Sequence, residues 1–174
     1  MNFDLQKTVE ILERTPQTLQ VLLGGISEDW THENEGEGTW SAKEIISHLI
    51  LGERTDWIPR LKIIFSDRPD KTFEPFDMEA HLDYAKTYSL ESLLAEFQSL
   101  RNQNIETLKS LKITEENLDQ IGIHPALGKA TARELLATWT VHDLGHISQI
   151  GRVMAKQYRT EVGPWTAYAG ILKK

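Results

Sequence analysis

The chain contains no cysteine, and this absence excludes several kinds of chemistry at once. Disulfide bonds, cysteine nucleophiles and thiolate-ligated metals all need a thiol from the chain itself. Any metal site must therefore be built from His, Asp or Glu side chains. The six histidines of the sequence become the first residues to consider.

Basic runs, a secretion signal and long apolar runs are also missing. The net charge is −7 at pH 7, whereas a nucleic-acid-binding protein normally gathers Lys and Arg on one face. The start of the chain, MNFDLQKTVE, has neither a basic nor an apolar region, and no run approaches the roughly 18 apolar residues of a membrane span. We therefore expect a cytoplasmic protein that binds neither nucleic acid nor membranes.

The composition is that of a folded protein. The chain has 174 residues, of which 40% are hydrophobic and 26% are charged. One domain usually has about 100 to 200 residues, and this apolar fraction is too high for a disordered chain. We therefore predict a single domain over residues 1–174.

Four segments repeat apolar residues at the i, i+3, i+4 spacing of an amphipathic helix. In the first, residues 3–23, Pro16 interrupts the pattern and Thr15 can cap the segment that follows. We expect a kink or a split there, and a glycine pair then ends the helix. The acidic residues 28–40 show no periodicity and indicate a solvated loop.

Capping boxes predict where two of the other helices begin. In this motif a Ser or Thr is followed three residues later by Glu, and each side chain bonds the backbone amide of the other residue. Ser41 with Glu44 and Thr131 with Glu134 both fit the motif. Capping therefore explains Glu44 without a role at a functional site.

The remaining helices are expected over residues 41–65, 89–112 and 131–158, with a kink near Pro59 in the first of them. The connection at 67–88 combines turn residues with one short helical piece. No segment shows a persuasive alternation typical of strands, and there is no internal repeat. The pattern therefore predicts an all-α protein, an antiparallel-type four-helix bundle.

The segment TWTVHDLGHISQI carries two histidines, His142 and His146, four residues apart. On a helix they lie about 40° and one turn, about 6 Å, from each other, so they share a face. Leu135, Trp139 and Val153 lie within about 60° of His142, which places the pair on the apolar face and points it inward. Such a pair also occurs as ordinary core histidines, so a metal site needs a third ligand.

His48 is the histidine whose context matches this requirement. It lies in the middle of its helix on a mixed inward face, and Gly52, one turn later, would leave open space beside it. His32, His81 and His124 lie in the acidic loop, the short connecting piece and the loop before the last helix. We expect surface or loop roles for these three.

Three imidazoles from two helices would leave a fourth position open, as in catalytic zinc sites. A divalent cation there would lower the pKa of water to about 7 and polarise an electrophile.

Other residues near the pair allow competing interpretations. Gln149 can hydrogen-bond an imidazole or simply face a solvated pocket mouth, and Trp139 is expected to pack in the core. Asp143 brings HDLGH close to the zincin pattern, but such enzymes need a third ligand downstream, where only Glu161 stands. The histidine–aspartate dipeptide also occurs in HD-type phosphohydrolases, which require further residues. Both alternatives have little support.

Together these features resemble the DinB-like family, also known as YfiT-like metal-dependent hydrolases. The similarity covers nearly the whole chain, and its segments follow the order and spacing of the family. They are LERTPQTLQVLL, GTWSAKEIISHLILGERTDWIPRL, HPALGKATARELLATWTVHDLGHISQIGRVMAKQY and VGPWTAYAGIL.

The resemblance implies a four-helix bundle of up-down-down-up topology with a metal on three histidines, here His48, His142 and His146. It also implies zinc or nickel as the metal and a homodimer as the assembly.

The reaction is less well defined than the metal site, because the family spans hydrolases, thiol S-transferases and thiol-dependent isomerases. We expect a hydrolase acting on a small molecule. A bacillithiol-transferase-like S-transferase that uses a low-molecular-weight thiol is the first alternative, and a non-catalytic metal-binding or sensory module is the second. The sequence identifies no catalytic side chain beyond the three ligands.

Overall fold

A computed structural model describes residues 2–173 of the protein, which are mainly helical. The elements, in chain order, are α1 (Leu5–Leu23), α2 (Asp29–His32), α3 (Ala42–Thr55), α4 (Trp57–Ile64), α5 (Ala80–Thr87), α6 (Leu90–Ser110), α7 (Glu115–Leu118), β1 (Ile121–His124), β2 (Gly128–Thr131), α8 (Ala132–Lys156) and the 3₁₀ helices η1 (Gly163–Ala167) and η2 (Gly170–Lys173).

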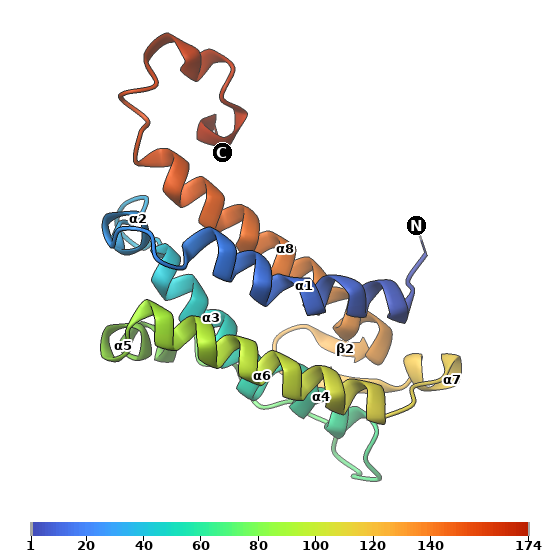
Figure 1. Cartoon of the computed structure of the whole chain (residues 1–174). Helices are drawn as coiled ribbons and strands as arrows, with labels where there is room; N and C mark the ends of the chain where they lie inside the picture. Colours follow the sequence, from blue (N-terminus) through green and yellow to red (C-terminus); the bar gives the residue numbers. More distant parts are fainter. Residues whose placement is uncertain (1, 174) are drawn as a thin grey trace.

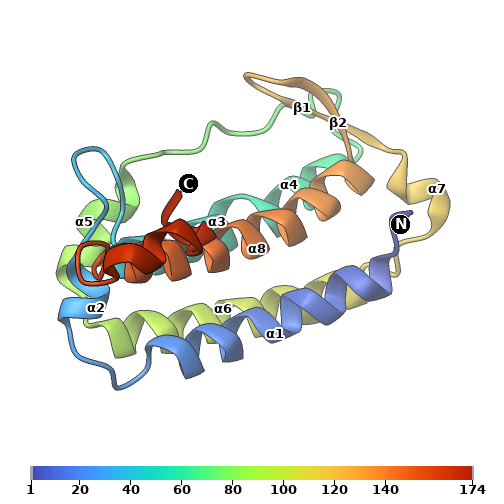
Figure 2. The same cartoon turned by 90° about the horizontal axis from the view of Figure 1, so that it is seen from above.

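The bundle consists of four helices. They are α1, the broken helix α3–α4, α6 and α8. Figures 1 and 2 show that α1 and α8 run in one direction, whereas α3, α4 and α6 run in the other. This is the up-down-down-up topology, so the predicted all-α four-helix bundle is confirmed. The single-domain prediction for residues 1–174 stays a prediction.

The parallel direction of α3 and α6 explains the long connection between them. Two parallel neighbours cannot be joined by a tight turn, so the chain after α4 must return along the bundle before α5 and α6 begin (Figure 2). Phe73 anchors this return at 2% exposure, and Thr72 forms a parallel bridge with Ile123. The predicted short helical piece in this connection is α5.

A β-hairpin between α7 and α8 corrects the prediction that the chain has no strand. β1 and β2 pair antiparallel, from Ile121 opposite Thr131 to His124 opposite Gly128. Gly128 has a φ of 78°, a left-handed conformation that a glycine adopts at little cost. Each strand has only four residues, too few for a reliable alternation of apolar and polar positions.

The first helix is continuous through Pro16, so the predicted split at this residue is wrong. Thr15 does not cap a new helix, because its Oγ1 donates to the carbonyl oxygen of Ile11 instead. A proline inside a helix costs about 3 kcal/mol. Burial of Leu12 and Leu19, both 0% exposed, opposes that cost by holding the two halves in one apolar face.

The second long helix breaks at Asp56 and not at Pro59. Asp56 has φ −99° and ψ −72°, and Pro59 lies in the first turn of α4, where a missing N–H disturbs no helical hydrogen bond. The predicted capping box of Ser41 and Glu44 is present, as is the one at the start of α8.

The acidic loop before α3 is more ordered than its sequence indicates. It contains α2, and the Glu35 carboxylate lies 2.7 Å from Nη2 of Arg152 and 2.8 Å from Nζ of Lys156. Hydrogen bonds from Arg152 and Lys156, acting against burial, lower the pKa of Glu35 to about 2. The interpretation as a fully solvated loop is therefore corrected.

The core has two apolar clusters at different heights along the bundle. One contains Leu12 and Trp139, and the other contains Leu19 and Ile150. Buried and half-buried polar groups of the long helices form two further clusters, the three histidines of α3 and α8 and the network around Arg101, which are described below. None of the helices within residues 2–173 is long and apolar enough to cross a membrane.

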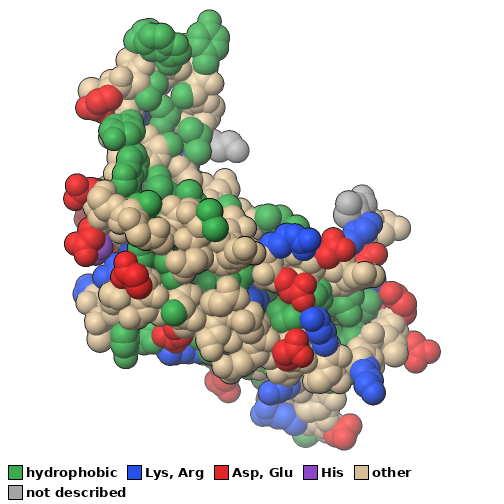
Figure 3. All heavy atoms as spheres, in the orientation of Figure 1, with side chains coloured by type: hydrophobic (Ala, Val, Ile, Leu, Met, Phe, Trp, Pro, Cys, Tyr) green, Lys and Arg blue, Asp and Glu red, His purple; other side chains and the backbone are tan. Residues whose placement is uncertain are grey.

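Beyond α8 the chain forms η1 and η2, which project past the end of this helix in Figure 1. Figure 3 shows hydrophobic side chains on the projecting segment. Trp165 is 71% exposed and Tyr168 is 89% exposed.

Candidate metal centre

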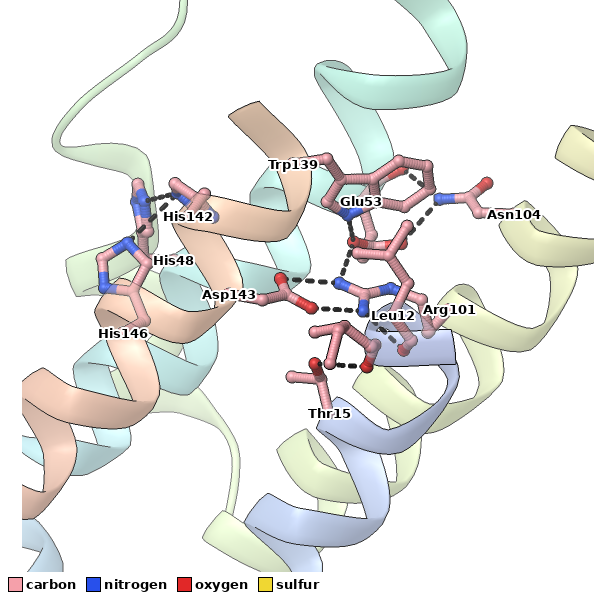
Figure 4. A network of polar contacts seen from close by, with 11 residues as sticks. Leu12, Thr15, His48, Glu53, Arg101, Asn104, Trp139, His142, Asp143 and His146 are labelled. Carbon is pink, nitrogen blue, oxygen red and sulfur yellow. Dashed lines mark hydrogen bonds and ion pairs between the residues drawn. The ribbon is translucent and has the colours of Figure 1, made fainter. Parts of the chain in front are cut away.

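Three histidines from two helices converge inside the bundle. His48 comes from α3, and His142 and His146 come from α8, one turn apart. The Nε2 atom of His142 lies 3.1 Å from Nε2 of His48 and 3.1 Å from Nε2 of His146. Figure 4 shows the three rings turned toward one another. The inward orientation expected from the helical pattern is what the structure shows.

The spacing of these nitrogens fits a metal ion. A tetrahedral zinc with Zn–N bonds of about 2.0–2.1 Å places its ligand nitrogens about 3.4 Å apart. The three candidate ligand atoms lie within 4.8 Å of one another, with two of the separations at 3.1 Å. A small rotation of the rings would bring all three atoms to bonding distance of one point.

The protonation state of the three rings also suits a metal. Burial, followed by the neighbouring His146, lowers the pKa of His48 and of His142 to about 3. Burial likewise lowers the pKa of His146. All three rings are therefore neutral near pH 7, and the neutral imidazole is the form that ligates metals.

Gln149 orients one of the three ligands. Its Oε1 lies 2.8 Å from Nδ1 of His146, so Nδ1 carries the proton and Nε2 keeps its lone pair for a metal. The sequence offered this contact as one of two interpretations of Gln149. By contrast, the buried Nδ1 atoms of His48 and His142 have no hydrogen-bond partner within residues 2–173.

His81 departs from the role expected for it. The sequence predicted a surface or loop position, but His81 is 1% exposed and its ring centroid lies 5.4 Å from that of His48. Trp40 contacts both rings, and its ring centroid lies 4.8 Å from that of His48 and 4.4 Å from that of His81. The short helix α5 buries His81 by packing on α3, a tertiary contact that eight residues of sequence could not reveal.

The three ligand candidates open onto a cavity of about 340 Å³. The lining comes from the loop before α3, from α3, α4 and the residue between them, from α8, β1 and the return connection. The lining residues are Trp40, His48, Asp56, Arg60, Phe76, Met78, His124, His142 and His146.

The other two histidines lie in different surroundings. His124 was expected in a loop, but it ends β1 and lines the cavity. His32 lies on α2, where its Nδ1 is 2.9 Å from the carbonyl oxygen of Glu28. His32 is exposed and does not line the cavity.

Two tryptophans back the site from the core. The space expected beside Gly52 is filled, because a Cβ there would lie 3.3 Å from Nε1 of Trp57. Trp57 also contacts the ring of His142, with centroids 5.1 Å apart. Trp139 stacks on Trp57 and is 0% exposed, so its expected role in the core is correct. No local sequence pattern distinguishes Trp57 from an ordinary core residue.

A network of buried charges lies on the opposite side of α8 from the histidines (Figure 4). Its centre is Arg101 of α6, whose guanidinium binds both carboxylate oxygens of Asp143, at 2.6 and 3.0 Å. The same guanidinium donates to Glu53 at 2.7 Å. Burial alone would lower the pKa of Arg101, but the carboxylates of Glu53 and Asp143 raise it above its ordinary value.

Asp143 therefore has a structural partner that the zincin interpretation did not foresee. It is 0% exposed, and its two oxygens are engaged by Arg101. A general base needs access to the proton it removes, which Asp143 lacks. The sequence did not identify Arg101 or Glu53, because a lone charged residue on a helix is usually solvated.

Pro16 explains a fourth hydrogen bond of this network. Because proline has no N–H, the carbonyl oxygen of Leu12, four residues earlier, lacks its helical donor. Nη1 of Arg101 donates to this oxygen at 2.8 Å. The continuous helix through Pro16 thus offers an acceptor to a buried cation from another helix.

Comparisons with known proteins agree with this fold. A "putative metal-dependent hydrolase" of Oceanobacillus iheyensis is 22% identical over 148 residues, which cover 84% of this chain and 83% of that protein. The solved structure of YfiT from Bacillus subtilis, described as a probable metal-dependent hydrolase with an unusual four-helix bundle topology, matches with a TM-score of 0.73 at 17% identity. The match covers 89% of this chain and 87% of that one.

A sequence profile of the DinB superfamily matches residues 11–150. This range spans the bundle and includes all three converging histidines. The resemblance inferred from the sequence is thereby confirmed, and the chain belongs to the DinB superfamily.

Proposed function

We propose that the protein is a metal-dependent hydrolase in which His48, His142 and His146 hold a divalent cation, zinc or nickel. The observation that carries the proposal is the convergence of three neutral imidazole nitrogens beside a cavity. A cation bound there would supply Lewis-acid chemistry, polarising an electrophile and lowering the pKa of a water or thiol. The descriptions of the Oceanobacillus protein and of YfiT as metal-dependent hydrolases support the same function.

The chain's own residues prepare the site for this chemistry. The three rings come from rigid helices, and Gln149 fixes the tautomer of His146. Trp57 packs behind His142, so solvent and substrate approach from the cavity side. The cavity volume of about 340 Å³ lies near the lower limit for ligand pockets, which supports a small-molecule substrate.

The metal content of the purified protein tests the premise. Elemental analysis should find about one divalent cation per chain in the protein purified without added metal. His48→Ala should lose it, whereas His32→Ala, which changes an exposed histidine on α2, should keep it. Full metal content in His48→Ala would show that the ligand set is wrong.

A thiol S-transferase would use the same ligands. The chain has no cysteine, so the thiol would have to come from a small molecule in the cavity. Electrophilic esters offered to the metal-loaded protein with and without a low-molecular-weight thiol separate the two reactions. Thiol-independent hydrolysis is expected, and strictly thiol-dependent turnover would replace the hydrolase with the transferase. No turnover, together with metal-dependent binding of a partner, would favour a sensory module.

A homodimer is the assembly we propose. Val141 and Leu144 of α8 are 68% and 48% exposed, and they line a groove of about 600 Å³ together with Phe3 and Ile11. Exposed apolar surface of this kind favours association with a second copy. Light scattering should report a dimer that Val141→Asp with Leu144→Asp converts to a monomer. A monomeric unmodified protein would contradict the proposal. The cytoplasmic location stays a prediction.

A further inference from the structure

One wall of the cavity carries a buried cation that the proposed metal chemistry does not use. Arg60 of α4 is 7% exposed, and its Nε and Nη2 atoms are buried without a hydrogen-bond partner in residues 2–173. The nearest anion is Asp56, whose Oδ1 lies 2.7 Å from Nη2 without forming a hydrogen bond. Arg60 also lines the cavity, and a buried guanidinium normally makes several hydrogen bonds, so the cation has N–H capacity that Asp56 alone does not use.

His124 adds a second donor to the same wall. Its Nδ1 accepts hydrogen bonds from the backbone N–H groups of Ala126 and Leu127, both at 3.2 Å. A neutral imidazole that accepts at Nδ1 must carry its proton at Nε2. Burial, followed by the charge of Arg60, lowers the pKa of His124, which favours this neutral form. His124 therefore offers an N–H donor in the same cavity lining as the cation of Arg60.

The fold holds these two donors in place. Phe73 packs under Arg60, with the guanidinium carbon 5.4 Å from the ring centroid. The backbone of Phe73 donates to the carbonyl oxygen of Ile123 at 2.8 Å, and Ile123 donates to that of Lys71 at 2.9 Å. These bonds tie the return connection to β1, the strand that ends at His124. The two donors are thus fixed by the buried packing of α4, the connection and the hairpin.

We propose that Arg60 and His124 form an anion subsite, which binds a carboxylate of the substrate while its electrophilic end faces the three histidines. Two donors in one cavity lining, one of them charged, suit the two oxygens of a carboxylate. A phosphate carries more negative charge than the single guanidinium of Arg60 can balance, because Asp56 already balances part of that positive charge. The inference rests on the proposed function for the electrophilic end, whereas the anion subsite depends on Arg60 and His124 alone.

The cavity also sets the kind of molecule that can span both ends. Trp40, Phe76 and Met78 line it together with the two sets of polar residues. A volume of about 340 Å³ admits a short chain of a few carbons. The expected substrates are small monoesters or monoamides that keep one free carboxylate.

Binding of small esters, measured by rapid mixing before turnover, tests the subsite directly. The metal-free and the zinc-loaded protein are each titrated with monomethyl succinate, dimethyl succinate and methyl phosphate. Binding is measured by the change in fluorescence of Trp40 and its neighbours. Monomethyl succinate should bind about tenfold or more tightly than the neutral diester, in both forms of the protein. Equal affinities would overturn the proposal, as would a preference that requires zinc. Tighter binding of methyl phosphate would replace the carboxylate with a phosphate.

Variants of the ion pair assign the effect to Arg60. Because Arg60→Met alone would leave Asp56 buried without a cation, the test uses Arg60→Met combined with Asp56→Asn, with unfolding curves to verify the fold. This double variant should lose the preference for monomethyl succinate. Asp56→Asn alone should bind it more tightly, because a competing carboxylate is gone. Arg54→Met, an exposed arginine of α3, is the matched control. A double variant that keeps the preference would refute the subsite.

Turnover separates this inference from the proposed function. The zinc-loaded protein is given 4-nitrophenyl hemisuccinate and the uncharged 4-nitrophenyl butyrate. A higher kcat/KM for the hemisuccinate, lost in the double variant, supports both proposals. Carboxylate binding without any ester cleavage would reject the hydrolase and keep the subsite. Cleavage of both esters at equal kcat/KM would reject the subsite and keep the hydrolase.

Discussion

Two polar clusters occupy the middle of the bundle, and neighbouring residues of α8 belong to different ones. His142 faces His48 and His146, whereas Asp143 turns about 100° away toward Arg101 (Figure 4). In the Arg101 cluster, four hydrogen bonds connect the guanidinium to Asp143, Glu53 and a backbone oxygen. In the histidine cluster, Nε2 of His142 lies 3.1 Å from Nε2 of His48 and from Nε2 of His146.

The difference separates a cluster that supports the fold from one that is ready for a ligand. Buried polar groups in folded proteins are almost always hydrogen-bonded, so groups left without partners mark places where something else binds. Within residues 2–173, Nε is the one buried guanidinium atom of Arg101 without a partner, whereas the Nε2 atoms of the three histidines lie against one another. We therefore expect disruption of the first cluster to change stability, and disruption of the second to change binding.

The largest expected effect is on the stability of the fold. Arg101→Met leaves the carboxylates of Glu53 and Asp143 buried without their cation, which should reduce the free energy of unfolding by about 3–5 kcal/mol. Urea unfolding of the metal-free protein measures this loss in the free energy of unfolding. Arg54→Met, which removes an arginine that is 42% exposed in its side chain, should leave the curve nearly unchanged. A similar loss in both variants would contradict the assignment of Arg101 to the fold.

Loss of a histidine ligand should change the metal affinity much more than the stability of the fold. His142→Ala is expected to weaken zinc affinity by more than about 100-fold, since even an outer hydrogen-bond partner contributes about 10–100-fold. Competition with a chromogenic chelator measures the affinity. His81→Ala is the matched control, because His81 is also buried and its ring nitrogens have no hydrogen-bond partner within residues 2–173. Equal losses in the two variants would mean that burial, and not ligation, decides metal affinity.

A smaller effect on metal binding is expected at Gln149. Gln149→Ala removes the acceptor of the Nδ1–H of His146, so the ring is free to turn or to change its tautomer. Zinc affinity should fall by about 10–100-fold, while urea unfolding of the metal-free protein changes little because Gln149 is only half-buried. An unchanged zinc affinity would show that His146 is held by packing alone.

The last expected effect concerns pH. In the metal-free protein the pKa of His48 and of His142 is about 3, against 6.5 for an unperturbed histidine. Between pH 6.5 and 3 the unfolded chain therefore binds protons that the folded chain does not, and stability falls as the pH falls. Each of these rings should contribute about 1.4 kcal/mol per pH unit in this window. Above pH 6.5 the contribution is constant.

Urea unfolding at pH 7.5, 6.5 and 5.5 measures this slope. Because carboxylates also titrate at the acidic end, the comparison protein is the double variant His48→Gln with His142→Gln. Its stability should decline less steeply below pH 6.5. Identical slopes in the two proteins would show that the imidazoles are not kept neutral by burial.

Local signals made part of this structure predictable. The capping boxes of Ser41 and Thr131 depend on residues three apart, and both form as expected. The inward face of His142 and His146 follows from the angle between successive helical residues. Pro16 shows the limit of this reasoning, because its neighbours in the bundle hold α1 together despite the penalty that the sequence indicates.

Contacts between distant segments escaped the sequence. The pairing of Arg101 with Asp143 joins residues 42 positions apart, and no local pattern links them. His81 is buried only because α5 packs against α3, and the cavity wall at Arg60 and His124 exists only because a hairpin meets the return connection. Each of these features depends on the tertiary arrangement of weakly patterned segments.

The sequence by itself determined the four helices, their apolar faces, the absence of a thiol in the chain and the three histidines that meet. Those properties follow from residue type and helical periodicity, which act over a few residues. The tertiary structure alone decided which polar residues are satisfied by partners and which are left open, and where the cavity lies. Hydrogen-bond satisfaction depends on atoms brought together from α1, α3, α6 and α8, and only folding sets their distances.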